Sequence, residues 1–293
     1  DPRTLTVSLE AGPAQSGLTF DDSGRKFFCD PTHPLRTLMY EQRYLARNPY
    51  FPAPPEIIEV ASPATAIFRF VSSDAPRPAS GGPATTNEPA RAVAQVTNVL
   101  AAAWLTNAQG CVVYRGHAFP SNYLGNVFIA DPSAHVIHRA VLREAGLDVA
   151  AVRAPGETNS EFVVSSDPGF RPAQIVNGPD GALYVADTQE GPKGGRIYRI
   201  VPANFKPPKP PRLGKAKTYD LVAILSHPNG WQRDTAARLL YERRDPKAVP
   251  LLASMLAAPR DPLARVHALH ALDGQSALNP TYVLNGLQDA EAR

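Results

Sequence analysis

The chain has 293 residues, of which 43% are hydrophobic and 19% charged, a composition too apolar for a disordered protein and ordinary for a folded one. Its formal net charge is only +3, and its basic residues form no stripe with interleaved aromatics, so no nucleic-acid partner is expected. No apolar run approaches the ~20 residues of a membrane-spanning helix, and we predict no transmembrane segment.

Three segments share one pattern, in which a glycine turn is followed by a short apolar strand and an aspartate. They are Asp22–Asp30, Leu124–Asp131 and Pro179–Asp187. Glycine supplies the positive φ of a tight turn, the aromatic and β-branched residues suit a buried strand, and the aspartate is expected to cap the next turn. Returning strands are expected at Val136–Leu142 and Arg196–Val201. This repeated pattern predicts the blades of a β-propeller.

The spacing of the three glycines bounds the first domain. We assign residues 1–204 to propeller blades and place one degenerate blade at Ile57–Val71, between the first two units. The number of blades that this domain can hold is at the lower limit for a closed propeller. The propeller is therefore expected to be partial, with further blades supplied by other sequence or another chain. Residues 72–95, rich in Pro, Ser, Gly and Thr, are predicted to be a surface insertion.

The remaining sequence changes from strand to helix periodicity. Residues 205–217 form a proline-rich linker whose lysines keep an extended polyproline II segment solvated. In residues 218–293 apolar residues recur at three and four residue spacing, and Leu225, Leu256 and Leu287 recur at one fixed interval. That interval predicts a HEAT-like helical solenoid. The fold class is therefore predicted as mainly β plus α, an incomplete propeller followed by helical repeats.

Two cysteines, Cys29 and Cys111, are too few for a disulfide framework or a cysteine metal site, although one bridge between them is possible. Cys29 occupies the position that Ala130 and Ala186 take in the other two units. We therefore interpret Cys29 as a buried thiol that behaves as a small hydrophobic residue.

Ligands of a propeller gather where loops of several blades converge, and Arg171, Asn177 and Asp180 are predicted there as cofactor-binding residues. The oxygens of Asn177 and Asp180 could contribute to a Ca²⁺ site, but Asn-Gly-Pro-Asp-Gly is also good turn chemistry, which is the favoured interpretation. His267 and His270 are interpreted as a packed or solvated pair. No metal site is predicted.

No catalytic residue can be named from the sequence. His117 and His138 have no visible partner that would orient them for acid-base work. No glycine-rich phosphate loop precedes a helix, so nucleotide binding has no support.

Several strings resemble a bacterial group of membrane-bound dehydrogenases. The longest is Phe170-Arg-Pro-Ala-Gln-Ile-Val-Asn-Gly-Pro-Asp-Gly-Ala-Leu-Tyr-Val-Ala-Asp187, followed by Gly195-Arg-Ile-Tyr-Arg-Ile-Val201. Shorter strings similar to the same group occur elsewhere in the chain: Tyr44–Pro49, Cys111–Gly116, Asn126–Asp131, His138-Arg139 and Leu225–Leu240. These strings are spread from residue 44 to residue 240, so the resemblance extends over nearly the whole chain.

The resemblance implies a propeller like that of quinoprotein sugar or alcohol dehydrogenases, HEAT repeats and often a c-type haem domain. It implies electron transfer in the periplasm or another extracytoplasmic space, possible pyrroloquinoline quinone and Ca²⁺, and a membrane association made through partners such as a c-type cytochrome. The sequence departs from the group because it has no Cys-x-x-Cys-His haem motif and lacks the early blades where a catalytic histidine is expected.

Three interpretations follow. The first is a redox-associated module of a larger electron-transfer protein; if it is an enzyme, it is a quinone-dependent dehydrogenase whose catalytic blades lie outside this chain. The second is a non-catalytic scaffold that binds other protein subunits or further domains of the same polypeptide. The third is a lactonase-like hydrolase with Ca²⁺ bound in the propeller.

Overall fold

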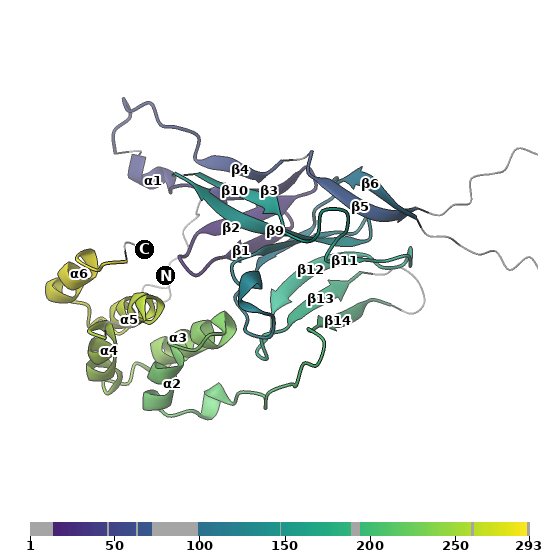
Figure 1. Ribbon diagram of the computed structural model, residues 1–293. Coiled ribbons are helices and arrows are strands. Elements are labelled where there is room, and N and C mark those ends of the chain that lie inside the picture. The colour runs from purple at the N-terminus through teal and green to yellow at the C-terminus, as the bar shows by residue number, and fades with distance from the viewer. Residues whose placement is uncertain are drawn as a thin grey trace, which may run out of the picture.

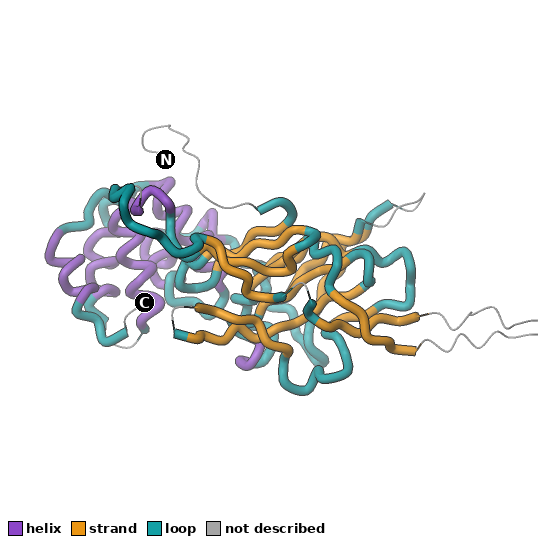
Figure 2. Tube along the Cα trace, turned by 90° about the horizontal axis from the view of Figure 1, so that it is seen from above, coloured by secondary structure: helices purple, strands orange, loops and turns teal. Residues whose placement is uncertain are grey.

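The computed structural model describes residues 14–45, 47–62, 64–71, 99–146, 148–188, 194–258 and 261–291. Strands gather in one part of the molecule and helices lie beside them in another (Figures 1 and 2). The fold is thus mixed β and α, with several antiparallel sheets and six α-helices among the described residues. None of these sheets closes on itself as a barrel within those ranges.

Three of the sheets are antiparallel meanders in chain order. The first consists of β1 (Gly17–Phe20), β2 (Lys26–Asp30), β3 (His33–Leu38) and β4 (Ile57–Ala61). The second consists of β7 (Gly110–Val113), β8 (Val127–Asp131), β9 (Val136–Ala145) and β10 (Asp148–Arg153), with β11 (Val163–Val164) also paired to β9. The third consists of β12 (Pro172–Asn177), β13 (Leu183–Asp187) and β14 (Arg196–Ile200).

The three glycine-to-aspartate units occupy equivalent places, because β2, β8 and β13 are each the second strand of their meander. The turn before each strand has its glycine at positive φ, +80° at Gly24, +75° at Gly125 and +84° at Gly181, as the sequence predicts. Asp30 caps the next turn by accepting the backbone N–H groups of residues 32 and 33. Burial acts to raise its pKa, but these bonds and those from the side chains of residues 32 and 33 lower it to about 2.

The predicted degenerate blade at 57–71 is wrong. Its first half is β4, which completes the first sheet by pairing with β3 and sets Ala61 opposite the buried Leu35. Its second half is β5 (Ala66–Val71), which pairs with β6 (Val99–Trp104) in a separate two-stranded ribbon. The long interval between Gly24 and Gly125 is therefore explained by the β5–β6 hairpin and not by an additional blade. The insertion predicted at 72–95 lies outside the described residues.

Glycines let the first strand of one sheet approach the first strand of the next. A Cβ on Gly17 of β1 would lie 2.8 Å from the backbone nitrogen of Cys111 on β7, and one on Gly110 of β7 would lie 2.2 Å from the carbonyl oxygen of Ala173 on β12. Since real Cβ atoms do not make such contacts, both positions need glycine. One apolar core lies between the first and second sheets and another between the second and third.

The open edge of β7 is covered by side chains instead of a strand. Thr19 of β1 accepts the N–H of Val113 at 3.1 Å. Asn177, at the end of β12, donates to the carbonyl of Val113 at 2.9 Å and accepts the N–H of Arg115 at 3.1 Å. These bonds satisfy backbone groups that an edge strand would otherwise leave unpaired.

Five helices follow the sheets: α2 (Thr218–Ile224), α3 (Gly230–Arg243), α4 (Ala248–Leu256), α5 (Pro262–Gly274) and α6 (Pro280–Leu287). A short α1 (Gln42–Leu45) lies between β3 and β4. Asp261 and Asn279 cap α5 and α6 through their side chains, each followed by a proline at the first helical position.

Helix α2 packs on α4 and α3 packs on α5, so the helices stack as successive pairs. The helical content predicted for residues 218–293 is confirmed. Of the regularly spaced leucines, Leu225 and Leu256 are buried in the helical core, whereas Leu287 is 78% exposed. None of the helices in the described ranges has the length and apolar character needed to cross a bilayer.

Candidate functional site

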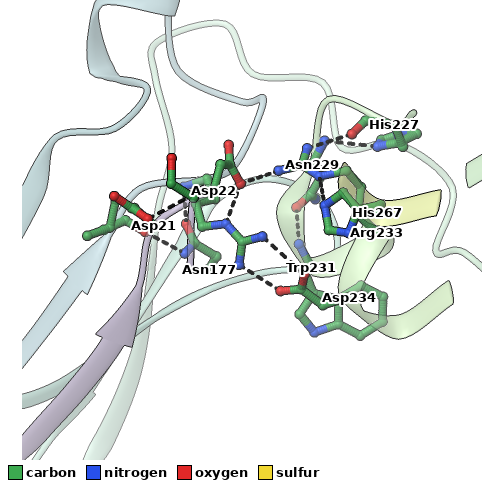
Figure 3. Close-up of polar contacts among 12 residues, drawn as sticks. Asp21, Asp22, Asn177, His227, Asn229, Trp231, Arg233, Asp234 and His267 are labelled. Carbon is green, nitrogen blue, oxygen red and sulfur yellow. Dashed lines mark hydrogen bonds and ion pairs between the residues drawn. The ribbon is translucent and has the colours of Figure 1, made fainter. Parts of the chain in front are cut away.

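Turns from all three meanders meet the first turn of α3. They are the turn between β1 and β2, the segment after β7 and the turn between β12 and β13. We call the four charged residues that join them the junction network: Asp22, Arg115, Arg233 and Asp234. Figure 3 shows Asp22 beside Arg233 and Asp234 of α3.

Arg115 lies at the centre of the junction network. Its Nε donates to Asp22 at 2.5 Å, and its two terminal nitrogens donate to Asp234 on α3 at 2.7 and 3.0 Å. Burial acts to lower the pKa of Arg115, but the carboxylates of Asp234 and Asp22 outweigh it and raise the pKa. The guanidinium is therefore a permanent cation that binds a sheet turn and a helix at once.

Arg233 completes the junction network from the helical side. It is the largest fully buried side chain among the described residues, with 2% exposure. It donates to the same Asp22 oxygen as Arg115, to the carbonyl of His227 at 2.7 Å and to the Nε2 of His267 at 3.2 Å. Asp22 thus accepts from two arginines that lie far apart in the sequence.

Residues at the N-terminal turn of α3 also donate hydrogen bonds to backbone carbonyls of the sheet turns. Asn229 donates to the carbonyls of Gly178 and Pro179 at 3.0 and 3.1 Å, and Gln232 donates to the latter at 3.1 Å. The N–H of Gly230 donates to the carbonyl of Arg115 at 2.7 Å. A Cβ on Gly230 would lie 2.8 Å from the Arg115 side chain, so this close approach requires glycine.

Of the three predicted cofactor-binding residues, Asn177 and Asp180 lie at this end of the sheets. The amide of Asn177 is occupied by β7, as described above. Asp180 is 9% exposed; it accepts the N–H of Ala182 and the hydroxyl of Tyr184, both at 3.1 Å, and the guanidinium of Arg199 at 3.4 Å. The oxygens of Asp180 therefore hold the turn, in agreement with the turn chemistry favoured from the sequence, whereas the amide of Asn177 bonds to the β7 segment.

Arg171 lies elsewhere. It is exposed and precedes β12, whereas Asn177 ends it, so at ~3.3 Å per residue the two residues are separated by roughly 20 Å. Its backbone N–H donates to Asp187 at 2.8 Å. The structure does not bring the three residues together, because Arg171 lies at the opposite end of β12 from Asn177. The three therefore do not form one site, and Asn177 and Asp180 alone offer fewer than the roughly six to eight oxygens that Ca²⁺ takes. A role of each residue in cofactor binding stays a prediction.

A buried acid-base pair escaped the sequence analysis. His138 on β9 contacts Glu161 through Nδ1 at 2.7 Å, and their side chains are 2% and 0% exposed. Glu161 also accepts from Arg153 and from the N–H of Phe68, each at 3.0 Å. This cluster ties the β5–β6 ribbon to the second sheet. Twenty-odd residues separate the pair along the chain, and no local signal marks Glu161 as the partner.

His267 packs against the junction network, as the packed interpretation of this residue predicts, and His270 is exposed. Burial and the neighbouring Arg233 lower the pKa of His267 to about 4. Among the described residues, no three His, Cys, Asp or Glu side chains gather closely enough to hold a metal ion.

His267 is expected to make the fold sensitive to acid. Because its folded pKa lies below its ordinary value of 6.5, the unfolded chain binds a proton first as the pH falls, and stability present above pH 6.5 is lost toward pH 4. Titration of His267 is expected to lower the free energy of unfolding at pH 5 by about 2 kcal/mol relative to pH 8. Urea unfolding at the two pH values measures it.

The control is His267→Gln, which keeps an acceptor for Arg233 but does not titrate. Its loss of stability between pH 8 and pH 5 should be smaller than that of the wild type by about 2 kcal/mol. Some acid sensitivity should remain, because burial and the nearby His117 and Arg233 also lower the pKa of His227. Equal pH dependence in both proteins would contradict the assignment.

A pocket of about 370 Å³ opens beside the junction network. It is lined by residues of the turn after β1, by the end of α4, by α5 and by residues around α6: Asp22, Ser23, Leu256, Asp261, Pro262, Leu263, Arg265, Val266, Leu269, Gly286, Asp289 and Glu291. Its apolar lining comes from the helices; of its charged residues, Asp22 is paired with Arg115 and Arg233, and Asp289 with Arg265. Asp22 and Ser23 come from the sheets, so the docking of the helices supplies part of the pocket's wall.

Comparison with known proteins gives one family match. The family model described as "Domain of unknown function (DUF7133)" matches residues 1–191. A crystal structure of glucose dehydrogenase is 19% identical, with 64% of this chain and 63% of that chain covered and a TM-score of 0.27. The chain thus spans less than two thirds of that protein's length. No curated protein matches the chain.

Proposed function

Because the chain belongs to the family of domains of unknown function DUF7133, whose name assigns no activity, we propose a function from its geometry: a non-catalytic scaffold within a larger redox assembly. In this proposal the sheets and helices form one rigid body whose joint surface binds partner proteins. The proposal takes up the scaffold interpretation of the sequence for the chain itself. It keeps the redox interpretation for the assembly around it.

The observation that carries the proposal is the occupation of the sheet turns by α3. Loops at one end of such sheets are where a small ligand is ordinarily presented. Here the carbonyls of Gly178 and Pro179 accept hydrogen bonds from Asn229 and Gln232. The charged groups of Arg115 and Asp22 bind Asp234 and Arg233 of α3. Polar groups that could recognise a substrate thus hold the two parts of the chain together.

The surface offers features suited to protein partners. Large apolar side chains stand exposed on separate elements, including Tyr50 at 92% between β3 and β4, Ile197 at 78% on β14 and Leu287 on α6. Because they lie on separate elements, they supply apolar contact area without marking a single interface. The pocket beside the junction network adds a concave site whose apolar lining comes from the helices.

The architecture proposed for this scaffold is an incomplete β-propeller over residues 1–204, a linker over 205–217 and a HEAT-like solenoid over 218–293. Support for blades comes from the equivalent places of β2, β8 and β13 and from the repeated glycine contacts of Gly17 and Gly110. Support for a solenoid comes from the stacking of α2 on α4 and of α3 on α5.

The redox setting rests on the sequence strings that resemble membrane-bound dehydrogenases. On that basis the proposed location is the periplasm or another extracytoplasmic space. The proposed partners are protein subunits, further domains or a c-type cytochrome that carry the quinone or haem chemistry themselves.

The test is affinity purification of the tagged full chain from cells that make it, followed by size-exclusion chromatography and mass spectrometry. We expect a complex of fixed stoichiometry that contains a haem or quinone protein. Asp22→Asn, which weakens the connection between sheets and helices, should lower the yield of the complex at least threefold. Asp234→Asn changes an exposed residue of the same junction network and should leave the yield of the complex unchanged. A monomer from those cells, or dye reduction by the purified chain with an aldose, pyrroloquinoline quinone and Ca²⁺, would overturn the proposal.

A further inference from the structure

The two cysteines meet in the core between the first and second sheets. Cys29 on β2 is 0% exposed and Cys111 on β7 is 1% exposed, and both thiols are free. They belong to separate meanders whose strands β2 and β7 lie in contact. The burial predicted for Cys29 is confirmed.

Gly17 brings the thiols together. It is the cross-strand partner of Cys29 in the β1–β2 pair, and a Cβ there would lie 2.7 Å from the Sγ of Cys29 and 2.8 Å from the backbone nitrogen of Cys111. With no side chain at this position, the Cys29 thiol reaches across β1 toward β7. A hydrogen bond to Cys29, together with burial, raises the pKa of Cys111.

We propose that Cys29 and Cys111 form a disulfide when the chain folds in the presence of a small-molecule disulfide, and that this bond joins the first sheet to the second. The inference does not depend on the proposed scaffold function. It concerns a covalent site that the free-thiol interpretation of Cys29 leaves out.

The chemistry is thiol–disulfide exchange with an oxidant such as oxidised glutathione. One cysteine thiolate attacks the glutathione disulfide, forming a mixed disulfide and releasing one glutathione thiol. The second cysteine thiolate then displaces the other glutathione. In total the two protein thiols lose two protons and two electrons, and one molecule of oxidised glutathione becomes two of the reduced form.

Burial decides when the bond can form. Only a thiolate attacks a disulfide, and a buried thiol without a cationic neighbour is a poor nucleophile. Both cysteines are enclosed once the sheets have packed. The bond should therefore form during folding, and the folded, reduced protein should react at least tenfold more slowly with the same oxidant.

The experiment refolds the full chain from urea in a mixture of oxidised and reduced glutathione, and in parallel with a reductant. Free thiols are alkylated and the protein is digested with trypsin without reduction. We expect the peptide 27–36 linked to the peptide 92–115 as the main cysteine product. The oxidised protein should have a Tm about 5–10 °C above that of the reduced protein, because the bond constrains the unfolded chain.

Cys29→Ser and Cys111→Ser are the controls. Each should fold under reducing conditions with the wild-type circular dichroism spectrum, and each should lose both the linked peptides and the rise in Tm. Recovery of the two wild-type peptides separately, alkylated or carrying glutathione, from protein with the native spectrum would overturn the proposal. Equally rapid bond formation in the folded, reduced protein would overturn the claim that burial sets the timing.

Discussion

Replacing Asp22 with asparagine is expected to lower the free energy of unfolding by about 2–3 kcal/mol, because the change leaves two arginines without their shared carboxylate. Arg233 is 2% exposed and Arg115 is largely enclosed, so water cannot replace the lost partner fully. The estimate is below the ~3–5 kcal/mol of a fully buried pair because Asp22 is 28% exposed.

Urea unfolding measures this effect with two built-in probes. The chain contains two tryptophans: Trp104 on β6 reports on the strands and Trp231 on α3 reports on the helices. Because Asp22 joins the two parts, we expect the wild type to unfold in one transition and the variant to show an earlier loss of helical signal. Single-tryptophan variants, Trp104→Phe and Trp231→Phe, separate the two signals.

Asp234→Asn is the matched control, since it removes the other carboxylate of Arg115. Asp234 is 51% exposed, so its pair with Arg115 is screened by water and its loss should cost under ~1 kcal/mol. Equal costs for the two variants would show that burial does not govern the junction network. No measurable cost for Asp22→Asn would remove the basis for a rigid connection between sheets and helices.

Local rules explain what could be predicted. The strands β2, β8 and β13 follow a glycine that the turn requires at positive φ and end at a polar residue, and both features lie within nine residues of sequence. The helices follow from apolar periodicity and from caps such as Asp261-Pro262. Each signal acts over a few residues, so a single sequence contains it.

The candidate site depends on contacts that no local pattern records. Asp22 meets Arg233 across 211 positions of sequence, and no local pattern pairs the two residues. Asn177 and Asp180 carry the chemistry of a ligand site, yet β7 and the turn use their atoms. The sequence thus predicts which residue types a candidate site contains. Which partners those side chains bind depends on which elements pack together.

Replacing Gly110 with alanine is expected to destabilise the fold by about 3 kcal/mol, because the added methyl group would meet backbone and cannot be accommodated by a side-chain rotation. The new Cβ would lie 2.2 Å from the carbonyl oxygen of Ala173 and 3.0 Å from the Cα of Gln174. Strands β7 and β12 would have to separate, which would open the core between the second and third sheets and strain the bonds of Asn177.

The matched control is Gly214→Ala, in the 3₁₀ turn Leu213–Lys215 between sheets and helices. An added Cβ there meets nothing within 4 Å, and the backbone has no positive φ, so the change should be neutral or stabilising by up to ~1 kcal/mol. Thermal and urea unfolding of both variants beside the wild type make the comparison. If Gly110→Ala were as stable as Gly214→Ala, the close approach of first strands would not hold these sheets together, and the blade arrangement proposed for residues 1–204 would lose its physical basis.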